Sequence, residues 1–281
     1  MSTRGSAEAR PITVPELVAM KRRGQKIVMV TAYDYLFARL ADEAGIHVLL
    51  VGDSLGMVVE GRETTLHVTL EQTLYHTAMV RRGARRALVV ADMPFLTYQV
   101  SVAEAVRNCG RVLKETGAHA VKVEGGLEVV DTVRRLVEVG IPVMAHIGLT
   151  PQKVHRFGGF RVQGRTREAR ERLKEEALAL QEAGAFSLVL ESVPLELARE
   201  ITEMLEIPTI GIGAGPYTDG QVLVIHDLLG LFEEFKPRFV KRYALLAQEV
   251  RRALQAFKAD VEQGRFPTEE HSFRLKPEEA S

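Results

Sequence analysis

Eight short apolar segments, most of them followed by a segment with helical periodicity, constrain the fold of this 281-residue chain more than any other feature. Parallel strands need helical crossovers, and strands covered on both faces are apolar along almost their whole length. The alternation therefore predicts a (β/α)₈ barrel, with an open doubly wound sheet as the alternative. The apolar segments are Ile27–Thr31, Val48–Val51, Ala87–Ala91, Ala118–Val123, Ile141–Ala145, Ser187–Leu190, Pro208–Ile212 and Gln221–Ile225.

The two ends of the chain add a cap and a tail to the predicted barrel. Thr13 can cap a helix that has a proline in its first turn and a glutamate three residues after the cap, so Thr13–Arg22 is expected to close one end of the barrel. A long helix is predicted over Arg238–Val261, and a polar tail over about 262–281. Because no linker or repeat divides the chain, residues 1–281 are expected to form one domain.

Charge and cysteine content limit the partners and the compartment. The 37 basic and 37 acidic side chains cancel, so nothing favours binding to nucleic acid or to an anionic membrane. Cys109 is the only cysteine, which rules out an internal disulfide and favours a reducing compartment. No apolar run is long enough to span a bilayer. We expect a soluble cytoplasmic protein.

Charged side chains recur where the predicted strands end. In a (β/α)₈ barrel the chemistry gathers at the C-terminal ends of the strands. Successive strand residues face opposite sides, so Lys122 and Glu124 are expected to share the barrel interior. Burial of that pair favours a functional site over a structural ion pair. The residues at or just past a strand end are Asp53, Asp92, Lys122, Glu124, His146 and Glu191.

Three of these residues could hold a metal ion. Asp53, Asp92 and Glu124 offer carboxylate oxygens from three adjacent strands, which suits a hard cation such as Mg²⁺ better than zinc. The alternative is that one or more of these acids caps the helix that follows. Ser54 could either contact the substrate or act as a cap.

A metal ion next to Lys122 would make a receptor for an α-keto acid. Chelation of the keto and carboxylate oxygens acidifies the neighbouring carbon, and a separate base must then take its proton. Glu191 is the predicted base, because it stands apart in sequence from the metal cluster; it could instead be a cap or an ion-pair residue. His146 could orient the substrate or be a hydrogen-bonded residue of the rim. The segment His155–Arg165 is predicted to be a mobile loop that acts as a lid.

Seven motifs together resemble the 3-methyl-2-oxobutanoate (ketopantoate) hydroxymethyltransferase family, and the resemblance covers about Thr13–Tyr243. One departure is Thr218, where many relatives have cysteine. The motifs are Thr31–Asp34, Gly52–Met57, Asp92–Phe95, Val121–Gly125, His146–Gln152, Gly158–Phe160 with Val162–Gly164, and Ile210–Gly215 with Asp219–Val224.

The resemblance implies a barrel of the phosphoenolpyruvate/pyruvate superfamily that uses one Mg²⁺ per subunit. It implies transfer of a hydroxymethyl group from 5,10-methylenetetrahydrofolate to 3-methyl-2-oxobutanoate, in pantothenate and coenzyme A synthesis, by a homodecamer. Arg156 and Arg161 are candidates to meet the glutamate tail of the folate. By motif, the implied roles are metal and substrate contact for Asp53 and Asp92, substrate contact for Ser54 and Lys122, metal contact for Glu124, and proton acceptance for Glu191.

Three other functions stay open at this point. One is a carbon–carbon lyase of the same superfamily that acts on a dicarboxylate without folate. The second is a Schiff-base aldolase that uses Lys122. The third is a non-catalytic binding or assembly scaffold, in which the acids would be dispensable.

Overall fold

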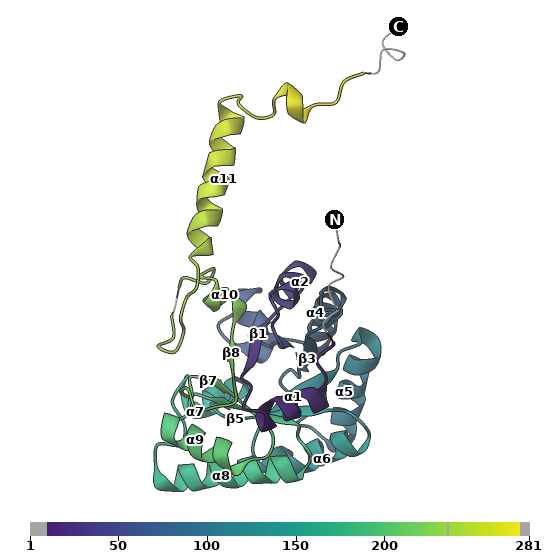
Figure 1. Cartoon of the computed structure of the whole chain (residues 1–281), viewed down its shortest axis with the longest axis vertical. Coiled ribbons are helices and arrows are strands. Elements are labelled where there is room, and N and C mark those ends of the chain that lie inside the picture. The colour runs from purple at the N-terminus through teal and green to yellow at the C-terminus, as the bar shows by residue number, and fades with distance from the viewer. Residues whose placement is uncertain (1–9, 235, 276–281) are drawn as a thin grey trace, which may run out of the picture. The chain divides into compact units, whose positions relative to one another are not determined.

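The computed structural model describes residues 10–234 and 236–275. Eight parallel strands close into a barrel in sequence order, as predicted, and helices surround them (Figure 1). The strands are β1 (Ile27–Thr31), β2 (Val48–Val51), β3 (Leu88–Asp92), β4 (Ala120–Glu124), β5 (Val143–Gly148), β6 (Ser187–Glu191), β7 (Thr209–Ile212) and β8 (Gly220–Leu223).

Five of the helices begin directly after a short polar side chain that caps them. In α1, α2, α4, α5 and α8 the residue before the helix accepts the backbone N–H three residues later. The α-helices are α1 (Val14–Arg22), α2 (Tyr35–Glu43), α3 (Leu55–Val58), α4 (Leu70–Gly83), α5 (Val102–Thr116), α6 (Val130–Glu138), α7 (Val154–Phe157), α8 (Arg167–Glu182), α9 (Leu195–Met204), α10 (Ile225–Leu228) and α11 (Leu246–Glu262). Single 3₁₀ turns are η1 (Thr65–His67), η2 (Leu127–Val129), η3 (Pro151–Lys153) and η4 (Glu269–His271).

The apolar core has two layers because strand side chains alternate. Val121 and Val123 of β4 belong to the outer layer, between the strands and the surrounding helices. Met144 of β5 lies in the inner layer, which also contains Leu17 and Met20 of α1. The α1 helix therefore packs against the barrel interior at the end where the strands start, as the predicted capping helix requires.

Contacts divide the chain into two compact units. The barrel unit consists of residues 1–225 with 238–240, and a C-terminal unit consists of residues 226–237 with 241–281. That residues 1–281 form one domain stays a prediction. Of the predicted polar tail, residues 262–275 are described and contain η4, whereas residues 276–281 lie outside the described part.

Most strand bounds are shifted by one to three residues from the predicted ones, and two other segments also differ from the sequence prediction. The long helix predicted from Arg238 starts only at Leu246. Tertiary contacts explain the later start, because Val240 is buried and the Phe239 ring packs on Gly213. The loop predicted over 155–165 begins with the helical turn α7.

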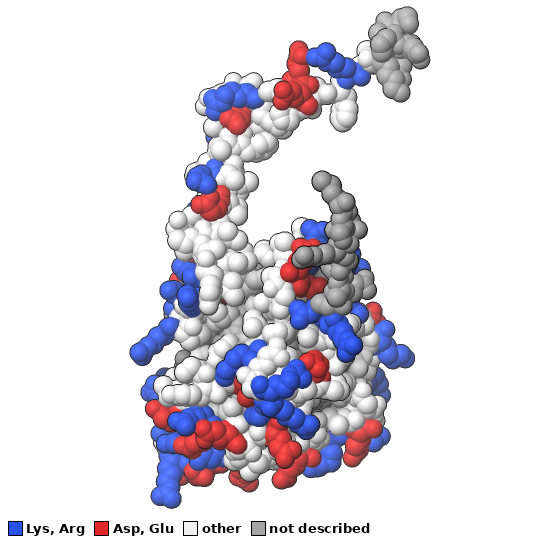
Figure 2. Space-filling view, viewed as in Figure 1, with Lys and Arg blue, Asp and Glu red and all other residues white. Residues whose placement is uncertain are grey.

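Neither positive nor negative charge predominates on the face of the barrel unit that Figure 2 shows. Figure 2 shows Lys and Arg intermixed with Asp and Glu over that face. Among the described residues, no helix combines the length and the apolar character that crossing a membrane requires.

Candidate active site at the strand ends

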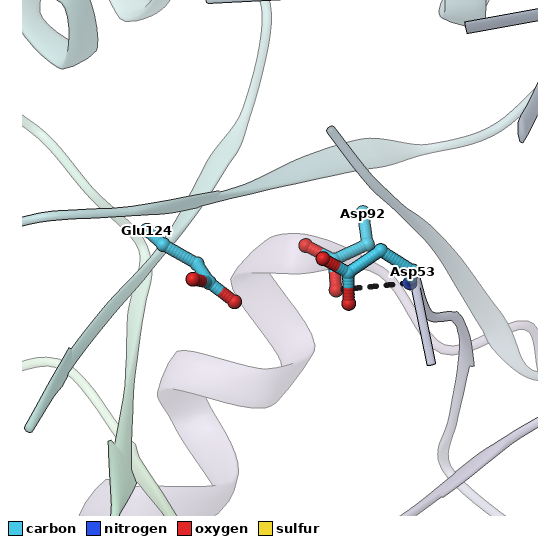
Figure 3. A group of neighbouring side chains, drawn as sticks. All are labelled: Asp53, Asp92 and Glu124. Carbon is cyan, nitrogen blue, oxygen red and sulfur yellow. Dashed lines mark hydrogen bonds between the residues drawn. The ribbon is translucent and has the colours of Figure 1, made fainter. Parts of the chain in front are cut away.

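Three acids come together at the ends of β2, β3 and β4. Asp53 follows β2, Asp92 ends β3 and Glu124 ends β4, and all three are buried. One carboxylate oxygen from each lies within 4.8 Å of the other two. Figure 3 shows the Glu124 carboxylate pointing toward the two aspartates, while the Asp53 backbone N–H donates to Asp92 Oδ2 at 3.4 Å. None of the three caps the helix that follows its own strand, so the capping alternative does not apply.

Lys122 shares the barrel interior with Glu124, as the strand period predicts. Its ammonium donates to both oxygens of Asp92, at 2.6 and 2.8 Å, and lies 3.5 Å from Glu124 Oε1. The register of the sheet causes this arrangement, because Asp92 of β3 is paired with Lys122 of β4. The ammonium therefore occupies one side of the acid cluster.

The cluster carries more negative than positive charge. Burial raises the pKa of Asp53 well above its usual range, and repulsion by Asp92 and Glu124 adds to this. Burial acts in the same direction on Glu124, but Lys122 and His146 outweigh it and lower that pKa to about 2. Glu124 Oε1 is buried without a hydrogen-bond partner among the described residues.

A divalent cation fits this arrangement. It would offset the surplus charge that Lys122 leaves and would give Glu124 Oε1 a partner. Carboxylate oxygens are also the ligands that Mg²⁺ prefers. Asp53, Asp92 and Glu124 are therefore the residues that could hold the ion.

Gln152 joins the acids into one hydrogen-bond network, although no role was predicted for it from the sequence. Its side-chain amide donates to Asp53 Oδ2 at 3.0 Å and to the Met93 carbonyl at 2.9 Å. Its backbone N–H donates to Glu124 Oε2 at 3.1 Å, and its amide oxygen accepts from the buried Tyr98 hydroxyl at 2.8 Å. The only sequence signal was its place at the end of the His146–Gln152 motif.

His146 lies between two carboxylates. Its Nδ1 is 3.5 Å from Glu124 Oε1, and its Nε2 is 3.4 Å from Glu191 Oε2. Burial and Lys122 act to lower the pKa of this imidazole, but the two glutamates outweigh them and raise it to about 9. A protonated ring would therefore link the acid cluster to Glu191.

Glu191 and Ser54 lie at the edge of the site. Glu191 ends β6 and its side chain is 16% exposed, so solvent and small molecules can reach it. It does not cap α9, because Pro194 occupies the N-cap position. The Ser54 hydroxyl shares a 2.8 Å hydrogen bond with the Tyr33 hydroxyl and forms no cap bond in α3.

Solved structures of other enzymes share the fold of this chain. The chain superimposes on 2,3-dimethylmalate lyase, a PEP mutase/isocitrate lyase superfamily member, with a TM-score of 0.58, at 19% identity and over 94% of this chain and 92% of that one. It superimposes on a phosphonopyruvate hydrolase solved with oxalate and Mg²⁺ with a TM-score of 0.60, at 12% identity and over 95% and 93% of the two chains. At these identities the likeness concerns the fold.

Sequence relatives are much closer. The 3-methyl-2-oxobutanoate hydroxymethyltransferase of Moorella thermoacetica is 58% identical over 95% of this chain and 100% of its own. The enzyme of the same name from Pelobacter propionicus is 56% identical over 94% of this chain and 98% of its own. A family model described as ketopantoate hydroxymethyltransferase matches residues 11–269. With the family model and these relatives spanning nearly its full length, the chain belongs to the ketopantoate hydroxymethyltransferase family.

Proposed function

We propose that this enzyme transfers a hydroxymethyl group from 5,10-methylenetetrahydrofolate to 3-methyl-2-oxobutanoate and so forms 2-dehydropantoate (ketopantoate), a step toward pantothenate and coenzyme A. Family membership supports the reaction. The observation that carries the proposal is the buried cluster of Asp53, Asp92 and Glu124 at the strand ends, with Glu191 at its edge.

One Mg²⁺ per subunit is proposed to sit on Asp53, Asp92 and Glu124. When bound there, the cation polarises the keto group of the substrate and makes the neighbouring C–H more acidic. Lys122 adds positive charge on the substrate's side of the cluster, and the Ser54 hydroxyl is placed to contact the substrate. The Lys122 ammonium is hydrogen-bonded to both oxygens of Asp92, and these bonds offset the cost of burying its charge.

Glu191 is the proposed base that removes the C3 proton of the keto acid. It belongs to β6, three strands from β3 and two from β4, and therefore reaches the site from a different part of the barrel wall than Asp92 and Lys122. His146 Nε2 lies 3.4 Å from the Glu191 carboxylate. The carbon that loses its proton then attacks the one-carbon unit of the folate. Overall, one water supplies the hydroxyl group, the two carbon–nitrogen bonds of the methylene bridge break, and tetrahydrofolate leaves. Residues 155–165 are proposed to cover the site during this step and to exclude water.

The base assignment is tested by proton exchange in deuterated water. Wild-type enzyme with Mg²⁺ is expected to exchange the C3 proton of 3-methyl-2-oxobutanoate without folate, and Glu191→Gln is expected to lose that exchange. Glu196→Gln, an exposed position in the first turn of α9, is the control. Exchange at the wild-type rate in Glu191→Gln would show that another group is the base.

Product analysis tests the reaction itself. The wild-type enzyme is expected to consume 5,10-methylenetetrahydrofolate only when 3-methyl-2-oxobutanoate is present, and mass spectrometry should find ketopantoate. Cleavage of a dicarboxylate without folate would instead support the lyase alternative. Binding of neither keto acid nor Mg²⁺ in calorimetry would support the scaffold alternative.

A Schiff-base mechanism through Lys122 is disfavoured. Burial acts to lower the pKa of this lysine, but Asp92, Glu124 and Asp53 outweigh it and raise the pKa above its usual value. The side chain is therefore an ammonium at neutral pH, which has no lone pair to attack a carbonyl.

The enzyme is also proposed to be a cytoplasmic homo-oligomer, a decamer by family resemblance. Apolar side chains of α11 at helical spacing support association: Val250, Leu254, Phe257 and Val261 are 47–62% exposed. Figure 2 shows mostly uncharged surface along this helix. Sedimentation velocity is expected to give one large species for the wild type and smaller species for Leu254→Asp.

A further inference from the structure

A cavity in the barrel unit lies beside β5, the strand next to the one that ends in Glu191. Its volume is about 220 Å³, and its walls come from the ends of β4 and β5, from η3 and α7, and from α8. Gly148 lines it and is paired in the sheet with Glu191, the proposed base. The cavity therefore adjoins the strand that carries the proposed base, although none of the residues proposed to hold the metal, contact the keto acid or act as the base lines it.

The charged lining of the cavity leaves one cation without a partner. Lys153 pairs with Glu128, and Arg172 pairs with Glu176 at 2.9 Å. The Arg156 side chain has no hydrogen bond, ion pair or ring contact with the described part of the chain. A ligand in the cavity thus meets one free guanidinium.

An unpartnered hydroxyl provides a second, independent sign of a ligand. Thr150 lines the cavity and is 3% exposed, yet its Oγ1 has no hydrogen-bond partner among the described residues. Burial of a hydroxyl without a partner is unfavourable. A bound acceptor would complete this hydrogen bond.

The cavity wall carries both cationic and carboxylate side chains, and this combination limits which anions it can bind. A guanidinium fork pairs well with a carboxylate, and Thr150 can donate to a second acceptor. Glu128 and Glu176 also line the cavity, but each is paired with a lining cation, so among the described residues the lining offers one unpaired positive charge together with carboxylate acceptors. A ligand whose carboxylates are spread apart and joined through an amide N–H fits donors and acceptors together.

We infer that this cavity binds the glutamyl end of the folate co-substrate, with Arg156 pairing with a carboxylate and Thr150 donating to an acceptor of the same group. The inference rests on the proposed function, since the folate is its second substrate. Arg161, the other arginine that the sequence suggested for this role, does not line the cavity.

The test compares tetrahydrofolate with tetrahydropteroate, which has the same pterin and benzoyl parts but no glutamyl group. In calorimetry on the full chain, the wild type is expected to bind tetrahydrofolate about tenfold more tightly than tetrahydropteroate, the size of one good charge-assisted contact. Arg156→Gln should bring that ratio below about twofold, while Arg167→Gln, an exposed arginine of α8 outside the cavity, should keep it.

Thr150→Val removes the unpartnered hydroxyl with little change of shape. It should weaken tetrahydrofolate binding about three- to tenfold. Thr77→Val is the matched control, because Thr77 is also buried with an unpartnered Oγ1 but lies outside the cavity.

Three results would overturn the inference: equal binding of the two ligands by the wild type, no detectable binding of either, or an unchanged ratio in Arg156→Gln. The proposed function fails separately. If the wild type discriminates between the ligands and Arg156→Gln does not, but the wild type forms no ketopantoate, the cavity assignment stands and the reaction is wrong. If it forms ketopantoate without discrimination, the reaction stands and the cavity assignment is wrong.

Discussion

His146 Nε2 lies 3.4 Å from Glu191 Oε2, while the other ring nitrogen faces Glu124 at 3.5 Å. The imidazole is buried, and neither nitrogen forms a geometrically good hydrogen bond among the described residues. Two carboxylates on different strands thus share one ring, and rotation of that ring would displace Glu191. We infer that His146 positions the proposed base.

The first prediction concerns His146→Gln. The amide cannot hold both glutamates, so kcat should fall about 10- to 100-fold while KM for the keto acid changes little. Steady-state kinetics separates the two parameters. A large rise in KM at constant kcat would show that His146 binds substrate and does not position the base.

The second prediction concerns Asp53→Asn in protein freed of metal by EDTA. Since burial and two neighbouring carboxylates raise the pKa of Asp53, the charged form is unfavourable in the folded state. Removal of that charge should raise the metal-free Tm by about 2–6 °C. Scanning calorimetry measures this, with the exposed Asp131→Asn as control.

Added Mg²⁺ should reverse the order of stability. A ligand that binds only the folded state stabilises it by about 2.7 kcal/mol at a hundred times its Kd. The wild type should therefore gain several degrees in Tm, while Asp53→Asn gains little. An equal gain in both proteins would place the cation elsewhere.

The side chains that meet at the strand ends were predictable, because the two-residue period of a strand and the order of the strands in a barrel can both be inferred from the sequence. Asp92 and Lys122 are neighbours by register, and Glu124 projects with Lys122 because they are two residues apart. The role of Gln152 was not predictable, since it reaches Asp53 from a segment 99 residues further along the chain. The start of α11 was missed because contacts of Phe239 and Val240 override the helical pattern.

The third prediction concerns Gln152→Met, which keeps the side-chain volume and removes the amide. The buried Asp53 carboxylate, the Met93 carbonyl and the Tyr98 hydroxyl would each lose a partner. The free energy of unfolding should fall by about 2–4 kcal/mol. Urea unfolding measures it, and the exposed Gln255→Met is the control. A change within about 0.5 kcal/mol, as for a surface site, would mean that the network adds no stability.

The last prediction concerns two histidines at the start of even-numbered strands. His47 Nδ1 accepts the Val28 N–H at 3.0 Å, and His119 Nδ1 accepts the Val89 N–H at 2.9 Å. Burial lowers the pKa of both rings below 6.5, and Arg86 and Arg81 contribute. Protonation would turn each acceptor nitrogen into a donor facing an N–H, so the folded state keeps these rings neutral.

Stability should therefore depend on pH in a defined direction. With the folded pKa below the unfolded value, the unfolded chain binds more protons as pH falls through about 6.5. The two neutral rings therefore contribute fully to the free energy of unfolding above about pH 6.5. This contribution is lost as the pH falls from there to the pKa values of the rings in the folded protein. Between about pH 7.5 and 5.5, wild type should lose more unfolding free energy than the double variant His47→Gln/His119→Gln. Other groups cancel in this difference, and His67→Gln, an exposed histidine, should behave as wild type. Equal losses in wild type and the double variant would mean that the two rings do not control acid stability.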